Sequence, residues 1–146
     1  MLNKFLTLFK KTPVSEDLLG VLLIIDRVGK FKHRVRLQKY VLIAQKDLKY
    51  PFSFNFERYF YGPYSFELKD FMSNLVSEGL VTETKVNLTK GVEYFYELTE
   101  VGKSVLSELL KNAEKKNIEI IEKLTKECKD MTDNEVIQKA KIVFGW

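Results

Sequence analysis

The clearest chemical feature of this sequence is a dense group of basic side chains between residues 27 and 49. This segment holds eight basic residues against the single acid Asp47, a local net charge of +7, although the whole chain of 146 residues carries only +4. Lys and Arg at this density are typical of a surface that contacts the phosphates of a nucleic acid. A solvated, lysine-rich helix face gives the same pattern, so both interpretations stay open. The candidate phosphate contacts are Lys30, Lys32, Arg34, Arg36, Lys39 and Lys46.

A second group of candidate residues follows the turn at Gly62-Pro63. Gly62 allows a positive φ angle, Pro63 restricts the backbone that follows, and Ser65 can cap the next helix. We favour this structural interpretation. The functional alternative is that backbone N–H groups at the start of that helix hold a phosphate, with Tyr64 and Ser65 as further phosphate contacts.

The side chains of the helix predicted after this turn are compatible with two kinds of partner, DNA and protein. Its outward side chains include Lys69, Ser73 and Asn74, which can hydrogen-bond to base edges in a DNA groove. The same helix holds more acidic than basic residues, and carboxylates close to phosphates weaken DNA binding. Its surface therefore suits a protein partner at least as well, with Phe66 and Asp70 as the candidate contacts.

Several function classes are excluded by the residue types that the chain contains. There is no Gly-rich phosphate loop, and His33 and Cys128 are the only residues of their kinds, so neither a catalytic triad nor a Cys/His metal cluster can form. We expect no enzyme activity, cofactor or metal, a solvated His33 and a buried Cys128. The longest apolar run, Val21–Ile25, is too short to span a membrane, and residues 1–11 do not form a secretory signal. These features predict a cytoplasmic protein.

The elements that must position these residues can be predicted from periodicity and capping signals. A short amphipathic helix is indicated by Leu2–Phe9. Further helices are expected over 13–28, where Gly29 ends the helix, over 34–48 and over 65–79. A strand is expected over 52–61, and a hairpin of strands 80–88 and 92–98 about Thr89-Lys90-Gly91. This order predicts an α+β, mostly α fold of the winged helix-turn-helix type. The hairpin is the wing, and Lys85 and Lys90 are its candidate DNA contacts.

A long C-terminal helix capped by Thr99 is predicted because nothing in residues 99–129 stops one. Thr132-Asp133-Asn134-Glu135 is a capping box that predicts a short final helix. One face of the long helix has heptad spacing, with a polar residue that can fix the register of a dimer. The predicted dimer interface is Leu106, Leu110, Ala113, Asn117, Ile120 and Leu124. The alternative is that the helix kinks within residues 111–117 and packs on its own domain. We expect a single domain over 1–146, with a winged-helix core at 12–102 and a helical dimerisation segment at 103–146.

Several short segments resemble the YwgA-like family of small prokaryotic proteins and, more distantly, the Panacea (SocA-like) antitoxin domain. These segments are Leu37-Gln38-Lys39-Tyr40, Phe56-Glu57, Tyr61-Gly62-Pro63-Tyr64-Ser65, Glu78-Gly79-Leu80-Val81 and the run from Tyr96 to Gly102. The resemblance implies a winged-helix-like fold and either gene regulation or toxin neutralisation through protein contact. It implies no catalytic residues.

The leading prediction from the sequence is a homodimeric transcriptional regulator that binds double-stranded DNA. The alternative is a protein-binding module, an antitoxin or an adaptor, that uses the same scaffold without recognising DNA. The basic segment favours the regulator, and the acidic character of the helix at 65–79 favours the protein-binding module.

Overall fold

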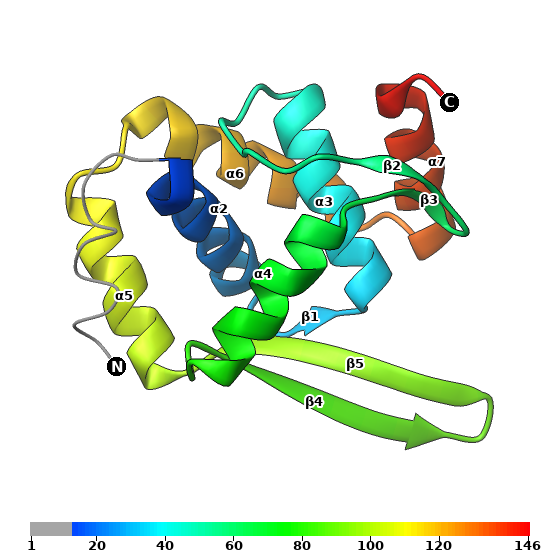
Figure 1. Ribbon diagram of the computed structural model, residues 1–146, viewed down its shortest axis with the longest axis horizontal. Coiled ribbons are helices and arrows are strands. Elements are labelled where there is room, and N and C mark those ends of the chain that lie inside the picture. The colour runs from blue at the N-terminus through cyan, green and yellow to red at the C-terminus, as the bar shows by residue number, and fades with distance from the viewer. Residues whose placement is uncertain (1–12) are drawn as a thin grey trace.

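The computed structural model describes residues 13–146 and has an α+β fold that is mostly helical, as predicted. The helix expected over Leu2–Phe9 lies outside the described residues. The helices are α2 (Pro13–Val28), α3 (Arg34–Lys46), α4 (Phe66–Ser77), α5 (Glu100–Lys111), α6 (Lys115–Cys128) and α7 (Asp133–Phe144). The strands are β1 (Phe31–Lys32), β2 (Glu57–Tyr59), β3 (Gly62–Tyr64), β4 (Val81–Leu88) and β5 (Gly91–Leu98). Figure 1 shows their arrangement.

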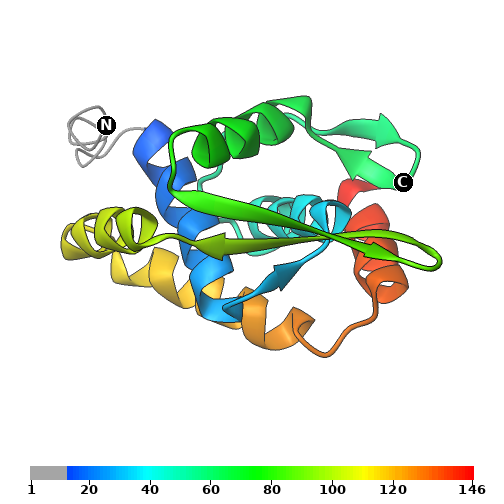
Figure 2. The same ribbon diagram turned by 90° about the horizontal axis from the view of Figure 1, so that it is seen from below.

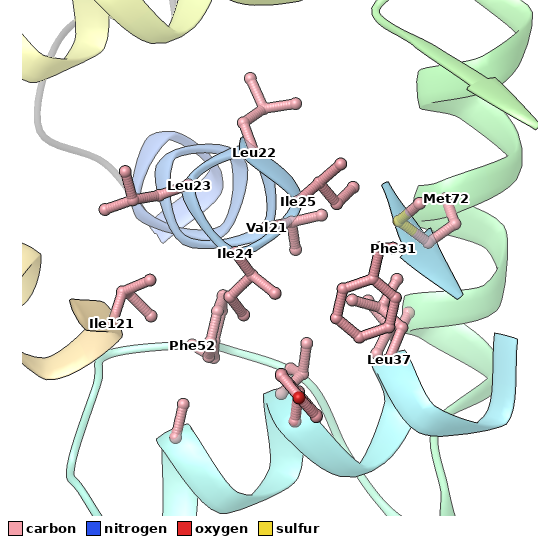
Figure 3. Close-up of a cluster of buried hydrophobic side chains, with 14 of the residues drawn as sticks. Val21, Leu22, Leu23, Ile24, Ile25, Phe31, Leu37, Phe52, Met72 and Ile121 are labelled. Carbon is pink, nitrogen blue, oxygen red and sulfur yellow. The ribbon is translucent and has the colours of Figure 1, made fainter. Parts of the chain in front are cut away.

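Helix α2 forms the centre of the molecule. The side chains of Val21, Leu22, Leu23, Ile24 and Ile25 point away from its axis in different directions (Figure 3), and all five are fully buried. A helix that is apolar on all sides has to be covered on all sides. Helices α5 and α6 and strand β5 contribute to that cover, because α2 packs against all three.

The main sheet is small and antiparallel, with the strand order β1-β5-β4. Strands β4 and β5 form a long hairpin that projects from the helical body (Figure 1). Leu88 pairs with Gly91, so the turn consists of Thr89 and Lys90 alone, one residue shorter than predicted. Gly91 has a φ of 136°, a backbone conformation in which a residue with a side chain would be strained.

The predicted strand over Phe52–Tyr61 is wrong for its first half, which is irregular, and only Glu57–Tyr59 forms a strand. The alternating Phe52 and Phe54 are buried, but without a partner strand. Asp17 of α2 holds this segment instead, because its carboxylate accepts hydrogen bonds from the backbone N–H and the hydroxyl of Ser53. The alternation therefore reflects burial against helices.

The continuous helix predicted over residues 99–129 is also wrong, because it breaks at residues 112–114 into α5 and α6. The break lets both halves pack on α2. The residues of the predicted dimer seam consequently belong to the chain's own core. Leu106, Asn117 and Leu124 are buried, and Leu110, Ala113 and Ile120 are partly buried against the same core. The structure agrees with the alternative prediction, in which the helix kinks within residues 111–117 and packs on its own domain.

Several local predictions about helix ends are confirmed. The hydroxyls of Ser65, Thr99 and Thr132 each cap the helix that follows, and Thr132 forms a complete capping box with Glu135. Gly29, with a φ of 88°, follows the last residue of α2. None of the helices within residues 13–146 combines the length and the apolar character needed to cross a membrane.

Candidate functional site

Two buried polar side chains of α3 fix the position of the neighbouring β2–β3 hairpin and of α4. Gln38 is 4% exposed; its amide nitrogen donates to the carbonyl of Ser65 at 2.9 Å and its amide oxygen accepts from the Ser65 N–H at 2.8 Å. Lys39 is fully buried, and its ammonium donates to the carbonyl of Pro63 at 2.8 Å. We call these three hydrogen bonds the α3 clamp. It fixes β3 and the first turn of α4 to α3.

The α3 clamp corrects two predicted phosphate contacts. Lys39 is enclosed by protein and cannot reach a phosphate. Burial, together with the nearby charge of Lys141, lowers the pKa of Lys39 from 10.5 to about 8. Ser65 is fully buried as well, its N–H donates to Gln38, and its hydroxyl accepts the cap hydrogen bond from Leu68. Ser65 is therefore not available to a phosphate, and the structural interpretation of the turn holds. The contact predicted for Tyr64, which is partly buried, stays a prediction.

Gly62 is required at this point for two reasons. Its φ is 98°, a conformation that side chains rarely adopt. A Cβ atom there would also lie only 3.3 Å from the Cε of Lys39. The turn can therefore cover the buried lysine closely only because residue 62 has no side chain.

The clamped hairpin presents a group of aromatic side chains at the surface. Phe60 and Tyr61 are 83% and 65% exposed at its tip, and Tyr59 and Phe66 are 41% and 42% exposed. The ring centroid of Tyr59 lies 5.0 Å from that of Tyr64 and 5.3 Å from that of Phe66. We call these five residues the aromatic surface. Exposed ring clusters of this kind mark interaction sites in soluble proteins.

The chain's C-terminal residue borders this aromatic surface. Trp146 is 40% exposed and lies between two cations, with the Arg58 guanidinium 4.8 Å and the Lys141 ammonium 5.0 Å from its ring centre. Figure 1 shows the C-terminus beside β2 and β3. Sequence reasoning named Tyr64 and Phe66 as candidate contacts but missed Tyr59, Phe60 and Tyr61, which it placed in the strand predicted over 52–61. The signal that could have found them is the run Tyr59-Phe60-Tyr61 directly before Gly-Pro.

Arg36 is another predicted phosphate contact that the structure corrects. Its side chain is only 12% exposed. The guanidinium donates to the carbonyls of Cys128 and Met131 at 2.8 and 2.7 Å and pairs with Asp133 at 2.9 Å. Arg36 thus connects α3 to the segment between α6 and α7 and has a structural role.

Arg34 is half exposed, but its charge is already paired. It makes two hydrogen bonds to Glu83 of β4, at 3.0 and 2.6 Å, and lies 3.7 Å above the ring centre of Tyr94. The hydrogen bonds from Arg34 hold the pKa of Glu83 below its ordinary value. Arg34 would have to leave this carboxylate before it could contact a phosphate with its full charge.

The remaining predicted contacts with DNA are exposed and stay predictions. On α4 these are Lys69, Ser73 and Asn74, and on the projecting hairpin they are Lys85 and Lys90. Lys69 and Ser73 also line a pocket of about 320 Å³ between α3, α4 and the β4–β5 hairpin. Lys30, Lys32 and Lys46 are exposed too, but they lie on other elements.

The two residues that could have suggested catalysis have structural surroundings. Cys128 is fully buried, as predicted, and burial raises the pKa of its thiol. His33 is partly buried rather than solvated; it begins α3 with a φ of 87°, and its Nδ1 is buried without a hydrogen-bond partner. Within residues 13–146, no three His, Cys, Asp or Glu side chains gather as a metal site would require.

Comparison with known proteins gives one informative relative. The chain is 37% identical over 78 residues to Uncharacterized protein YwgA of Bacillus subtilis (strain 168). The chain is similar to YwgA. The match covers 53% of this chain and 46% of YwgA, so it spans about half the length of that relative. No family model matches the chain, and no solved structure matches it.

Proposed function

We propose that this protein is a YwgA-like protein-binding module and that its partner docks on the aromatic surface. The observation that carries the proposal is the exposure of Tyr59, Phe60 and Tyr61 on a hairpin fixed by the buried α3 clamp, with Phe66 exposed at the start of α4. Aromatic side chains contribute much of the binding energy in protein interfaces. A surface that is already ordered loses little conformational entropy on binding, so the same contacts give a higher affinity.

The charges around the aromatic surface also favour a protein partner over DNA. The exposed side of α4 carries Glu67 and Asp70 beside Lys69, so that side has no excess of positive charge. Two of the basic residues expected to contact phosphates, Arg36 and Lys39, are used inside the protein. Phe66 and Asp70, the contacts expected for a protein partner, are both exposed.

The fold that we propose for this scaffold is a winged helix. Its support is the order α2-β1-α3-α4-β4-β5 together with the sheet order β1-β5-β4, with the β2–β3 hairpin inserted between α3 and α4. In this interpretation α4 is the recognition helix and the β4–β5 hairpin is the wing. The distant resemblance to an antitoxin domain agrees with a partner protein as the ligand.

A DNA-binding regulator remains the second candidate function. One observation favours it: Lys69, Ser73 and Asn74 on α4 are exposed, as are Lys85 and Lys90 on the projecting hairpin. Replacing Ser73 and Asn74 with Ala would then relax the preference between DNA sites by about 1–3 kcal/mol per lost base contact. A homodimer would need a surface other than the buried seam of α5 and α6.

The test compares two double variants that each remove two exposed apolar side chains. Phe60→Ser with Tyr61→Ser alters the aromatic surface, and Leu88→Ser with Val92→Ser is the matched control on the other hairpin, where these residues are 48% and 43% exposed. Partners are captured from cells of the source organism by quantitative affinity purification, and their affinities are then measured with purified proteins. We expect one partner that the wild type and the control retain and the aromatic variant loses. Equal loss by both variants, or no partner at all, would contradict the proposal.

A further inference from the structure

A second, chemically different surface lies between α6 and the segment that joins α2 to β1. It is an open groove of about 1000 Å³. Of the fifteen residues that line it, seven are Lys or Arg and two are acidic. In Figure 2, α6 lies on the other side of the β4–β5 hairpin from α4. The groove is therefore separate from both the aromatic surface and the predicted recognition helix.

Basic side chains line both sides of this groove. Lys30 and Lys32 lie on one side, and Lys123, Lys126 and Lys129 lie on the α6 side. A spacing of three residues places the α6 side chains on neighbouring positions of one helix face. Of the lysines in the groove, Lys30 and Lys32 come from the basic segment recognised in the sequence, as do the lining residues Arg27 and Arg36. The lysines at 123, 126 and 129 are interspersed with acids along the chain and join the cluster only through folding.

The acidic residues in the lining do not neutralise the groove. Glu122 pairs with Arg27 at 2.9 Å and Asp133 pairs with Arg36 at 2.9 Å. Outside the lining, Asp26 also pairs with Arg27, Glu93 with Lys32, and Glu127 with Lys123 at the long distance of 4.0 Å. Among residues 13–146, no acidic side chain forms an ion pair with Lys30, Lys126 or Lys129. These three ammonium groups attract a ligand that brings several negative charges.

The three groove cations without a carboxylate partner are all lysines, and the Lys30 ammonium lies 4.7 Å from the centre of the Phe95 ring. The type of cation indicates how the ligand is held. A lysine ammonium binds phosphate as a point charge, whereas the planar guanidinium groups that could hold a phosphate in two places, Arg27 and Arg36, are occupied by carboxylates. Contacts of the lysine type position a nucleic-acid backbone without recognising its sequence.

The aromatic residues of the groove indicate which form of nucleic acid fits. Phe31 and Tyr40 line it but are each only 1% exposed, and their rings pack edge to face at 4.9 Å. Single-stranded nucleic acid is normally held by rings on which its bases stack. The lining offers no free ring for such stacking, so a duplex, which presents its phosphates and keeps its bases inside, is the better match.

We propose that this basic groove binds the phosphate backbone of a double-stranded nucleic acid, independently of sequence. With Lys30, Lys126 and Lys129 as the contacts, the logarithm of the binding constant should fall with the logarithm of the salt concentration with a slope of about −3, at roughly 0.9 per phosphate contact. This proposal does not depend on the aromatic surface, so an experiment can disprove either proposal without affecting the other.

The test uses the full chain and a random-sequence duplex of about 20 base pairs, with binding followed by fluorescence anisotropy from about 50 to 200 mM salt. Lys126→Gln with Lys129→Gln should reduce the slope magnitude by about 2 and weaken binding at low salt. The control, Lys115→Gln with Lys116→Gln, removes the same charge from the first turn of α6, outside the groove, and should leave the slope unchanged. All four side chains are exposed, so the fold should persist, which a thermal melt checks.

Three outcomes would overturn the proposal. One is an undetectable interaction of the wild type with duplex at about 50 mM salt. Another is an equal effect of the two lysine pairs, which would mean attraction by overall charge rather than binding in the groove. The last is binding of inorganic triphosphate or of polyglutamate that depends on Lys126 and Lys129, without binding of duplex. That result would assign the groove to a small phosphate ligand or to an acidic protein segment.

Discussion

The side-chain amide of Gln38 hydrogen-bonds both backbone groups of Ser65, 27 positions further along the chain. Gln38 belongs to one of the segments that resemble the YwgA-like family, and Ser65 belongs to another. Lys39 makes a parallel connection to Pro63. The segments that contain Gln38 and Ser65 are far apart in the sequence but contact each other in the fold. This contact fixes the position of the aromatic surface.

Replacing Gln38 with Ala should destabilise the protein by about 1–3 kcal/mol, because the N–H of Ser65 would be left buried without a partner. The Ser65 carbonyl would still accept from the N–H of Lys69. Urea denaturation measures the change. Asn74→Ala is the control, since this amide is exposed on α4 and its loss should alter the free energy of unfolding by less than about 0.5 kcal/mol. A Gln38 variant as stable as this control would show that the α3 clamp is not a stabilising contact.

The buried Lys39 should make stability depend on pH in an unusual direction. Its pKa is lowered from 10.5 to about 8 in the folded protein, so between these values the unfolded chain binds more protons than the folded one. Stability contributed by this group therefore rises with pH across that window, by roughly 3 kcal/mol in total at 1.36 kcal/mol per pKa unit. Below about pH 8 the full cost of the buried charge remains.

Comparison with Lys39→Met isolates this contribution, because other titrating groups are common to both proteins. The free energy of unfolding of the wild type minus that of the variant should increase between pH 7 and pH 10. Chemical denaturation at several pH values gives this difference. A difference that stays constant over the range would mean that Lys39 titrates like an exposed lysine.

The sequence predicted most local structure correctly but not the role of its most informative residues. Helix starts at Ser65, Thr99 and Thr132 depend on neighbouring residues, so capping signals located them. Whether a basic side chain reaches solvent depends on residues far away in the chain. Arg36 is covered by residues 128–133, and Lys39 is covered by the turn at 62–63. No local sequence pattern predicts the burial of these two side chains.

The break between α5 and α6 was predicted only as the alternative to a continuous helix, for a related reason. Residues 112–114 contain neither Gly nor Pro, and the heptad spacing continues through them. The helix breaks because α2 is apolar on all sides and two shorter helices can cover it where one straight helix cannot. The apolar centre of residues 21–25 was visible in the sequence, but the way it would be covered was not.

Arg36→Ala should cost about 3 kcal/mol of stability, because two backbone carbonyls and the carboxylate of Asp133 lose a charged donor together. Arg34→Ala is the matched control. Its ion pair with Glu83 is half exposed, so its loss should cost no more than about 1 kcal/mol. Hydrogen exchange should in addition show loss of protection in α7 for the Arg36 variant only. Equal stability of the two variants would mean that the contacts of Arg36 with the α6–α7 segment contribute little.

The packing of the predicted dimer seam inside one chain leads to the last prediction. Leu124 is fully buried among residues of the same chain, so Leu124→Ala should destabilise the folded state by about 2–5 kcal/mol. This loss should be the same at protein concentrations tenfold apart, because no association step is involved. If the seam were an interface between chains, the melting temperature of the wild type would rise with concentration, and the variant would reduce that dependence. Thermal melts of both proteins at the two concentrations distinguish these cases. A melting temperature that rises with concentration in the wild type but not in the variant would show that Leu124 lies in an interface between chains.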